Sequence, residues 1–186
     1  MHEVLERRQP DLTVVLENVH DPHNIAAVLR SCDAVGAMNV HITRDPATKP
    51  HKKFSRRSSG SAATWIEVSE FPSIVESYAA LRLARYTIVA TGGGPSALSM
   101  GDLDLTGPVA IVLGNEMRGL TDEALAGADK IVTIPMVGMI RSLNISVACA
   151  VLLYEAFRQR DAAGLYTASR LSPEQVETFA IEWEKR

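Results

Sequence analysis

The chain has 186 residues and a formal net charge of −3, and 46% of its residues are hydrophobic. That size and composition fit one domain with a sizeable core, and the acidic balance gives no global signature of nucleic-acid binding. Both cysteines, Cys32 and Cys149, lie in apolar helical patterns, which predicts buried thiols and neither a disulfide framework nor a metal site. The N-terminus lacks an apolar signal region and no run is long enough to span a membrane, so we expect a cytoplasmic protein.

In the first half of the chain, strand-like apolar runs alternate with helical periods. This alternation is typical of an α/β fold with a mostly parallel sheet flanked by helices. Asp21 and Pro22 supply a helix N-cap and a proline at the first helical position, and Gly36 supplies a stop. The elements expected here are strands at residues 12–16, 40–43 and 64–68, a helix between residues 22 and 36, and a helix at residues 72–83.

The second half continues the same alternation. Thr121 is placed to cap a short helix, and Ser172 with Pro173 opens an amphipathic terminal helix whose apolar stripe needs either the main body or a second subunit to cover it. A long helix is apolar on nearly every face, and we expect it to be buried. The elements expected here are strands at residues 86–90, 109–113 and 131–134 and the long helix at residues 142–160.

A long basic loop separates the second and third expected strands, from residue 44 to about residue 60. Its cluster at residues 49–57 carries Phe54 among five Lys and Arg side chains. A basic run of this kind is either a solvated loop or a surface that grips a phosphate backbone. Loops of this length in compact domains are more often functional or disordered than decorative.

Three polar loops leave the carboxyl ends of expected strands, at residues 92–94, 114–119 and 135–144. Ligands of open α/β sheets bind at that edge. The glycine-rich turn at residues 92–94 does not fit the dinucleotide fingerprint, and no Walker loop is present. Ser142 is either an ordinary helix N-cap or part of a polar docking site at the start of the long helix.

Other polar residues leave two interpretations open. No Ser–His–Asp or Cys–His set stands out, and His20 with His23 gives only a weak metal signal beside a surface or capping role. Glu116 is either a functional carboxylate or one that binds loop amides. Arg30 lies about 120° around the helix from Asn24, so periodicity alone does not place the two on one face.

Three segments resemble the three sequence motifs of the SpoU/TrmH branch of the SPOUT methyltransferases. They are NVHDPHNIAAVLRSCDAVG at residues 18–36, IVLGNEMRGLTDEAL at residues 111–125, and residues 134–160, which open with IPMVGMIRSLN. The segments at residues 7–17 and 154–160 resemble, more narrowly, the members that 2′-O-methylate the D-loop guanosine at tRNA position 18.

The resemblance implies a fold and a cofactor. We expect one SPOUT methyltransferase domain over residues 1–186, with short helical extensions at about residues 1–11 and 161–186, a C-terminal deep trefoil knot and a homodimer. It further implies S-adenosylmethionine in the knot and no metal. The residues that would line the cofactor pocket are Thr91, Gly114, Glu116, Ile134, Met136, Ser142, Leu143 and Asn144.

The resemblance also implies roles in catalysis and in RNA binding. Arg30 would be the catalytic residue, as a base assisted by an RNA phosphate or as a clamp that stabilises the developing alkoxide, and Asn24 would help to arrange the site. The expected contacts to the tRNA backbone are Arg7, Arg8, Lys52, Lys53, Arg56, Arg57, Arg158 and Arg160. The alternatives are a methyltransferase for rRNA or for the tRNA wobble nucleotide, and a non-catalytic RNA-binding protein.

Overall fold

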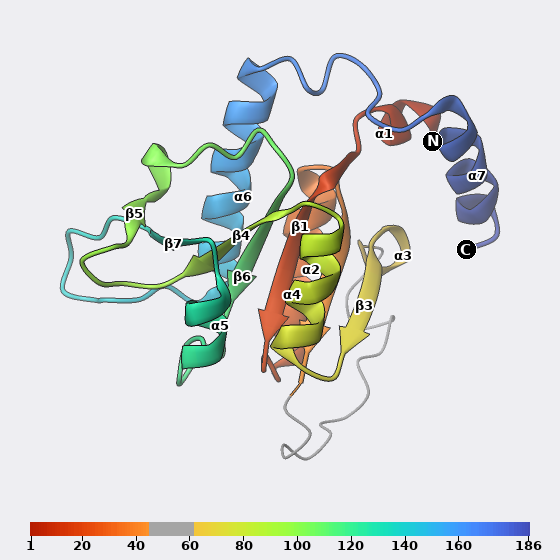
Figure 1. The fold of residues 1–186 in the computed structure, drawn as a ribbon. Coiled ribbons are helices and arrows are strands. Elements are labelled where there is room, and N and C mark those ends of the chain that lie inside the picture. The colour runs from red at the N-terminus through yellow and green to blue at the C-terminus, as the bar shows by residue number, and fades with distance from the viewer. Residues whose placement is uncertain (45–61) are drawn as a thin grey trace.

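Apolar runs of the chain form a seven-stranded, all-parallel sheet in the computed structural model, which describes residues 1–44 and 62–186 (Figure 1). The strand order is β3-β2-β1-β6-β4-β7-β5. The strands are β1 Gln9–Glu17, β2 Ala37–Thr43, β3 Glu67–Phe71, β4 Thr87–Thr91, β5 Leu98–Ser99, β6 Val109–Leu113 and β7 Lys130–Thr133. The predicted α/β class and its parallel sheet are therefore confirmed.

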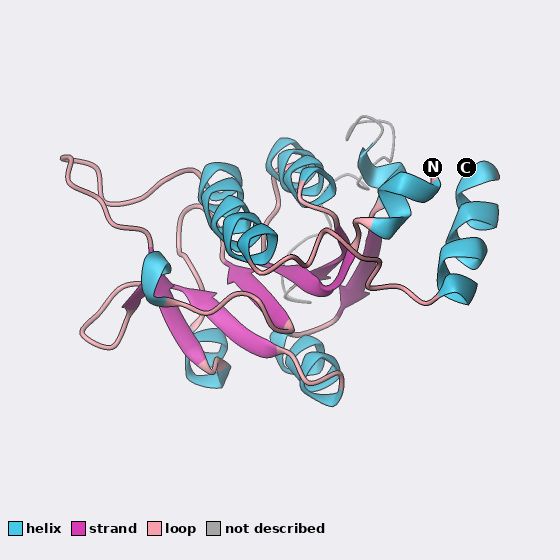
Figure 2. Ribbon diagram, turned by 90° about the horizontal axis from the view of Figure 1, so that it is seen from above, coloured by secondary structure: helices cyan, strands magenta, loops and turns pink. Residues whose placement is uncertain are grey.

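Helices cover both faces of this sheet (Figure 2). The helices are α1 His2–Glu6, α2 Pro22–Ala34, α3 Ala62–Trp65, α4 Ile74–Leu83, α5 Asp122–Gly127, α6 Ile145–Ala162 and α7 Pro173–Glu184, with a 3₁₀ turn at Met100–Asp102. Helices α2 and α6 pack on one face and α4 and α5 on the other. The central strands β1 and β6 are buried by both layers, which explains their nearly continuous apolar sequence.

Local capping signals in the sequence predicted several helix ends correctly. The Asp21 carboxylate accepts a hydrogen bond from the His23 amide at 2.9 Å, at the start of α2. Gly36, just beyond the end of α2, has a φ of +82°, and a Cβ there would lie 2.8 Å from the carbonyl oxygen of Arg7. Only glycine adopts that conformation readily, so the predicted stop is confirmed.

Other predicted boundaries were wrong. Part of the expected strand at residues 64–68 is the short helix α3, and the strand begins at Glu67. Helix α6 begins at Ile145 with Asn144 as its N-cap, so Ser142 lies in the preceding loop. The predicted basic loop at residues 44–60 lies almost entirely outside the described residues.

Helix α6 buries one face only. Its inner residues, among them Cys149 and Leu153, pack against α2 and the sheet, while Val147 and Tyr154 on the outer face are exposed. The prediction of a helix buried on every face is therefore wrong for a single chain. The apolar stripe of α7, in contrast, is covered by the main body, where Trp183 packs with Leu5 and Trp65.

Arg160 ties the end of α6 to the start of the sheet. Its side chain is 0% exposed, and its guanidinium donates to the carboxylate of Asp11 at 2.7 Å and to the side-chain oxygen of Gln9 at 3.0 Å. It also donates to the carbonyl oxygens of Leu105 and Gly107. Asp11 in turn pairs with Arg170, so one carboxylate joins the end of α6 to the segment that leads into α7.

We expect Arg160→Met to lower the free energy of unfolding by about 3 kcal/mol, because the substitution leaves the Gln9 side-chain oxygen and two carbonyl groups without their buried donor and Asp11 with Arg170 as its remaining cation. Chemical denaturation monitored by circular dichroism measures the loss. Arg158→Met, two residues away on an exposed side chain, is the matched control and should leave stability nearly unchanged. Equal stability of the two variants would contradict the structural role of Arg160.

Candidate functional site

The carboxyl ends of all seven strands in the described residues lie at one edge of the sheet, because every strand pair is parallel. The loops after β1, β4, β6 and β7 leave from this edge. Such an edge is where open α/β sheets bind ligands, so it is the candidate site. The residues predicted for the cofactor pocket all lie on these loops or at their ends.

A hydrogen-bonded network joins three segments that are far apart in the sequence. The Asn24 amide, in the first turn of α2, donates to Glu116 Oε1 at 2.6 Å. The Asn144 amide donates to Asn24 Oδ1 at 3.2 Å, and Asn144 Oδ1 accepts from the Ser146 amide at 2.8 Å. The structure thus brings together three of the predicted site residues, and Asn24 bridges the β6–α5 loop and the start of α6.

The β6–α5 loop, residues 114–121, is a narrow, closed turn. Asn115 and Gly119 exchange backbone hydrogen bonds at 2.8 and 3.0 Å. A Cβ on Gly114 would lie 2.2–2.4 Å from backbone atoms of Gly119 and Leu120, so this position requires glycine. The Asn115 side chain accepts from the amides of Met117 and Arg118 and donates to the Asn18 carbonyl oxygen. Sequence analysis did not single out Asn115, although an Asn after Gly114 is a typical signal for such a side-chain turn.

The loop before α6 is open. The backbone of residues 135–143 makes no hydrogen bond with any described residue, and Val137, Met139 and Ile140 are exposed. Unpaired backbone groups beside exposed apolar side chains are a suitable lining for a ligand or a partner chain. Four predicted cofactor residues, Ile134, Met136, Ser142 and Leu143, lie on this loop or at its ends.

Thr91, the last residue of β4, directs its hydroxyl back into the sheet, where it donates to the Val112 carbonyl oxygen at 2.9 Å. The two glycines that follow Gly92 are open, since a Cβ on Gly93 or Gly94 would meet nothing within 4 Å. This turn therefore presents backbone groups at the edge of the sheet, whereas the Thr91 side chain is already bonded.

Arg30 lies on α2, six residues beyond Asn24, and is exposed. Its guanidinium makes no hydrogen bond or ion pair with any described residue. Six residues of α-helix span about 9 Å along the axis, so Arg30 lies about one and two-thirds turns from Asn24. An unpaired cation so close to a polar edge is available to an anionic group of a ligand.

The basic residues predicted to contact RNA fall into three groups: those outside the described residues, those that are exposed and those that are buried. Lys52, Lys53, Arg56 and Arg57 lie outside the described residues. Arg7 is exposed, and Arg158 is exposed and paired with Glu155 at 2.7 Å, so both remain candidates.

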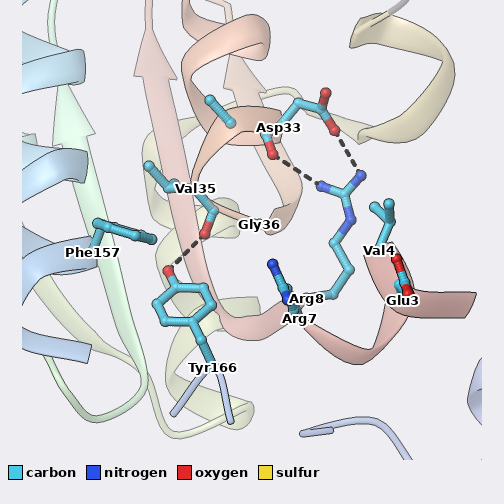
Figure 3. A pocket seen from close by; sticks show the side chains of 10 residues that line it. Glu3, Val4, Arg7, Arg8, Asp33, Val35, Gly36, Phe157 and Tyr166 are labelled. Carbon is cyan, nitrogen blue, oxygen red and sulfur yellow. Dashed lines mark hydrogen bonds and ion pairs between the residues drawn. The ribbon is translucent and has the colours of Figure 1, made fainter. Parts of the chain in front are cut away.

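Arg8 and Arg160 do not fit the prediction of an RNA contact. Arg8 is 1% exposed and pairs with Asp33 at 2.6 Å (Figure 3). It also donates to the carbonyl oxygen of Ala37 at 3.2 Å and lies over the ring of Trp183. The guanidinium groups of Arg8 and Arg160 are buried and bonded to groups inside the fold, so both arginines are structural residues.

A cavity of about 280 Å³ lies beside Arg8 at the amino edge of the sheet, opposite the candidate site. Figure 3 shows Glu3 and Val4 on one side, Phe157 and Tyr166 on the other, and Arg7 between them. The Tyr166 hydroxyl donates to the Val35 carbonyl oxygen at 2.7 Å, next to the end of α2. Within residues 1–44 and 62–186 no group of three or more His, Cys, Asp or Glu side chains is placed to hold a metal ion.

The fold and this edge define an open, parallel α/β protein with a ligand site beyond its strands. Residues 11–154 match the family model described as the SpoU rRNA Methylase family. The tRNA (guanosine(18)-2′-O)-methyltransferase of Thermus thermophilus is 44% identical over 186 residues, which cover 100% of this chain and 94% of that protein. This chain therefore belongs to the SpoU methylase family.

Solved structures agree with that assignment. The A. aeolicus TrmH/SpoU tRNA modifying enzyme superposes with a TM-score of 0.89 at 35% identity, covering 98% of this chain and 91% of that one. The SpoU methyltransferase AviRb from Streptomyces viridochromogenes, in complex with the cofactor AdoMet, superposes with a TM-score of 0.69 at 31% identity, covering 84% of this chain and 62% of that one. No helix in the described parts of the chain has the length and apolar character needed to cross a membrane.

The network makes a testable prediction for Asn24→Asp, which puts a second carboxylate beside Glu116. Mutual repulsion raises the pKa of the pair in the folded state, so the variant binds more protons folded than unfolded. We expect it to be about 1 kcal/mol less stable than wild type near neutral pH, and this deficit should shrink as the pH falls from about 7 towards about 4. Thermal unfolding at several pH values measures it. Asn24→Ala is the control, and a deficit in Asn24→Asp that does not vary with pH would contradict the contact.

Proposed function

We propose that this chain is an S-adenosylmethionine-dependent 2′-O-methyltransferase that acts on the D-loop guanosine at tRNA position 18. The observation that carries the proposal is the Asn24–Glu116–Asn144 network, with the unpaired Arg30 further along α2, in a chain that aligns along its whole length with an enzyme of that name. The full-length relative favours tRNA over rRNA, although the family model carries rRNA in its description. A tRNA substrate would place the protein in the cytoplasm.

The loops of the carboxyl edge fit a cofactor of this kind. The free backbone groups of residues 135–143 suit an adenine ring, which needs hydrogen bonds in one plane, and the exposed apolar side chains there suit its faces. Only one oxygen of Glu116 is engaged by Asn24, which leaves the other for a ribose hydroxyl. The holding residues would be Thr91 and Gly114 through their backbone, with Glu116, Ile134, Met136, Ser142, Leu143 and Asn144. When bound, S-adenosylmethionine supplies a methyl group activated by a sulfonium.

The residues of the protein then align the ribose hydroxyl and stabilise the negative charge that develops on its oxygen. Arginine side chains stay cationic in proteins, so we assign Arg30 to a clamp that holds an RNA phosphate and stabilises the developing alkoxide while the hydroxyl proton passes to solvent water. Asn24 would act through the network by holding the β6–α5 loop and the start of α6 in one arrangement. Alignment of two bound reactants is itself a large part of such a reaction.

We further propose that the chain forms a homodimer and that its C-terminal part is knotted, as one methyltransferase domain with short terminal extensions. Exposed apolar side chains support the dimer, because a second copy of the chain would bury them. They are Val147 and Tyr154 on α6 and Val137 and Met139 in the loop before it. Arg7, Arg158 and the basic cluster at residues 49–57 would contact the tRNA backbone. Arg158 lies about 21 Å along α6 from Asn144, a distance that a folded RNA can bridge.

A non-catalytic RNA-binding protein is the alternative from another class. The Asn24–Glu116–Asn144 network disfavours it, because a protein that only binds RNA has no need of this polar arrangement at the carboxyl edge.

Methyl transfer from labelled S-adenosylmethionine to an unmodified tRNA transcript tests the proposal. We expect label in the transcript and none in a transcript that carries 2′-deoxyguanosine at position 18, because that substrate lacks the accepting hydroxyl. Equal label in both would move the target to another nucleotide. No label in either, together with no cofactor binding in calorimetry, would favour the non-catalytic alternative.

The role of Arg30 is tested by Arg30→Ala and Arg30→Lys. We expect Arg30→Ala to lower kcat about 100-fold with cofactor affinity unchanged, since one charged stabiliser of the alkoxide is lost. Arg30→Lys should keep only a small part of the activity, because an ammonium lacks the two-pronged phosphate contact. Near-normal activity of Arg30→Lys that rises with pH would contradict the clamp and favour a base. Arg158→Lys is the control, because it makes the same substitution at another proposed RNA contact and so reports any general loss of RNA affinity.

A further inference from the structure

Glu17 is a buried carboxylate that none of the roles above uses. It is the last residue of β1, at the carboxyl edge, and it is only 3% exposed. Among the described residues no Lys, Arg or His forms an ion pair with it. Burying a carboxylate without a cation is costly unless hydrogen bonds compensate both oxygens.

Both oxygens of Glu17 are engaged by one residue, Thr121. Oε1 accepts from the Thr121 hydroxyl at 2.6 Å, and Oε2 accepts from the Thr121 amide at 2.9 Å. Thr121 is where the β6–α5 loop ends and α5 begins, and its hydroxyl oxygen accepts from the Ala124 amide at 3.1 Å. The carboxylate therefore fixes the far end of that loop through its hydroxyl and its backbone.

The near end of the same loop is held by the residue next to Glu17. The Asn18 carbonyl oxygen accepts from the Asn115 side-chain amide at 2.9 Å. Asn18 has a φ of +53°, which lies in the left-handed region that Asn tolerates better than most residues. The last residue of β1 and the residue that follows it thus hold both ends of the loop at residues 114–121.

Between these two ends, the loop has little freedom. Gly114 lies against Gly119 and Leu120, and Glu116 near the tip is fixed by Asn24. A second support holds the helix that follows, because the Tyr78 hydroxyl donates to the Ala124 carbonyl oxygen at 3.0 Å. Burial first, and the nearby Glu17 carboxylate second, raise the pKa of Tyr78, so this hydroxyl remains a donor.

We propose that Glu17 is a positioning residue: its grip on Thr121 keeps the loop at residues 114–121 closed, with Gly114 and Glu116 ready to bind the cofactor. The inference rests on the proposed function, because it assigns cofactor binding to this loop. An isosteric Gln would keep one acceptor and turn an NH₂ group towards a donor, so only a carboxylate satisfies both donors of Thr121 in their present positions. Without the carboxylate, the loop samples other conformations that it must leave before the cofactor binds. This lowers the affinity for the cofactor but does not alter the chemical step.

The experiment compares cofactor binding and turnover in Glu17→Gln, Thr121→Val and Thr121→Ser. Tyr86→Phe is the matched control, since it removes a 2.6 Å hydrogen bond to the Pro10 carbonyl oxygen at the opposite edge of the sheet. Calorimetry with S-adenosylmethionine is performed well below the thermal midpoint of every variant, and KM and kcat are measured with tRNA.

We expect Glu17→Gln to bind S-adenosylmethionine at least tenfold more weakly (about 1.4 kcal/mol) and to raise its KM equally. kcat at saturating cofactor and the KM for tRNA should stay within about threefold of wild type, because the loop closes once the cofactor is bound. Thr121→Val should show the same direction and Thr121→Ser should be close to wild type, because serine restores the hydroxyl. Tyr86→Phe should lower the thermal midpoint and leave cofactor affinity unchanged.

Wild-type cofactor affinity in folded Glu17→Gln would overturn the inference while leaving the proposed function intact. If Glu17→Gln does not fold, the two Thr121 variants decide. Equal cofactor affinities of Thr121→Val and Thr121→Ser would overturn the inference. A tenfold weaker affinity of Thr121→Val, with Thr121→Ser close to wild type, would support it. Wild-type protein that does not bind S-adenosylmethionine would overturn the proposed function and the inference together.

Discussion

The parallel register of β1 against β6 is the constraint from which the site follows. Leu16 pairs with Leu113, so the residues that follow this pair, Glu17 with Asn18 and Gly114 with Asn115, emerge side by side. The loop after β6 can then be gripped by the end of β1, and its tip can reach Asn24 at the start of α2. An antiparallel pair would have put these ends at opposite edges of the sheet, about 16 Å apart for five residues at about 3.3 Å per residue.

Helix α6 links the site to the rest of the molecule. At its start Asn144 caps the helix and contacts Asn24, and at its end Arg160 is bonded to the first residues of β1. One rigid element is thus anchored at both edges of the sheet, and α2 lies beside it with Cys32 and Cys149 in contact in the core. Because protein interiors are close-packed, α6 has little freedom to shift between these two anchors.

Arginines show where sequence reasoning was weakest. Arg7 and Arg8 are adjacent, Arg158 and Arg160 are two residues apart on α6, and each pair suggested one role. The structure separates them, since Arg8 and Arg160 are buried against carboxylates while Arg7 and Arg158 are exposed. A residue's charge can be read from the sequence, but its partner cannot, because Asp33 and Asp11 come from elements distant in the chain.

Local chemistry let the sequence determine much of this protein by itself: the alternating apolar runs, the Asp21 cap, the Gly36 stop and the Thr121 cap all act over a few residues. The motifs also brought Asn24, Glu116 and Asn144 forward as site residues. Only the tertiary structure decided that one hydrogen-bonded network joins them, that α6 leaves a face open, and that Glu17 and Asn115 organise the loop. Those features depend on pairs about 90 to 120 residues apart, and such contacts arise from strand register and helix packing, which no local pattern encodes.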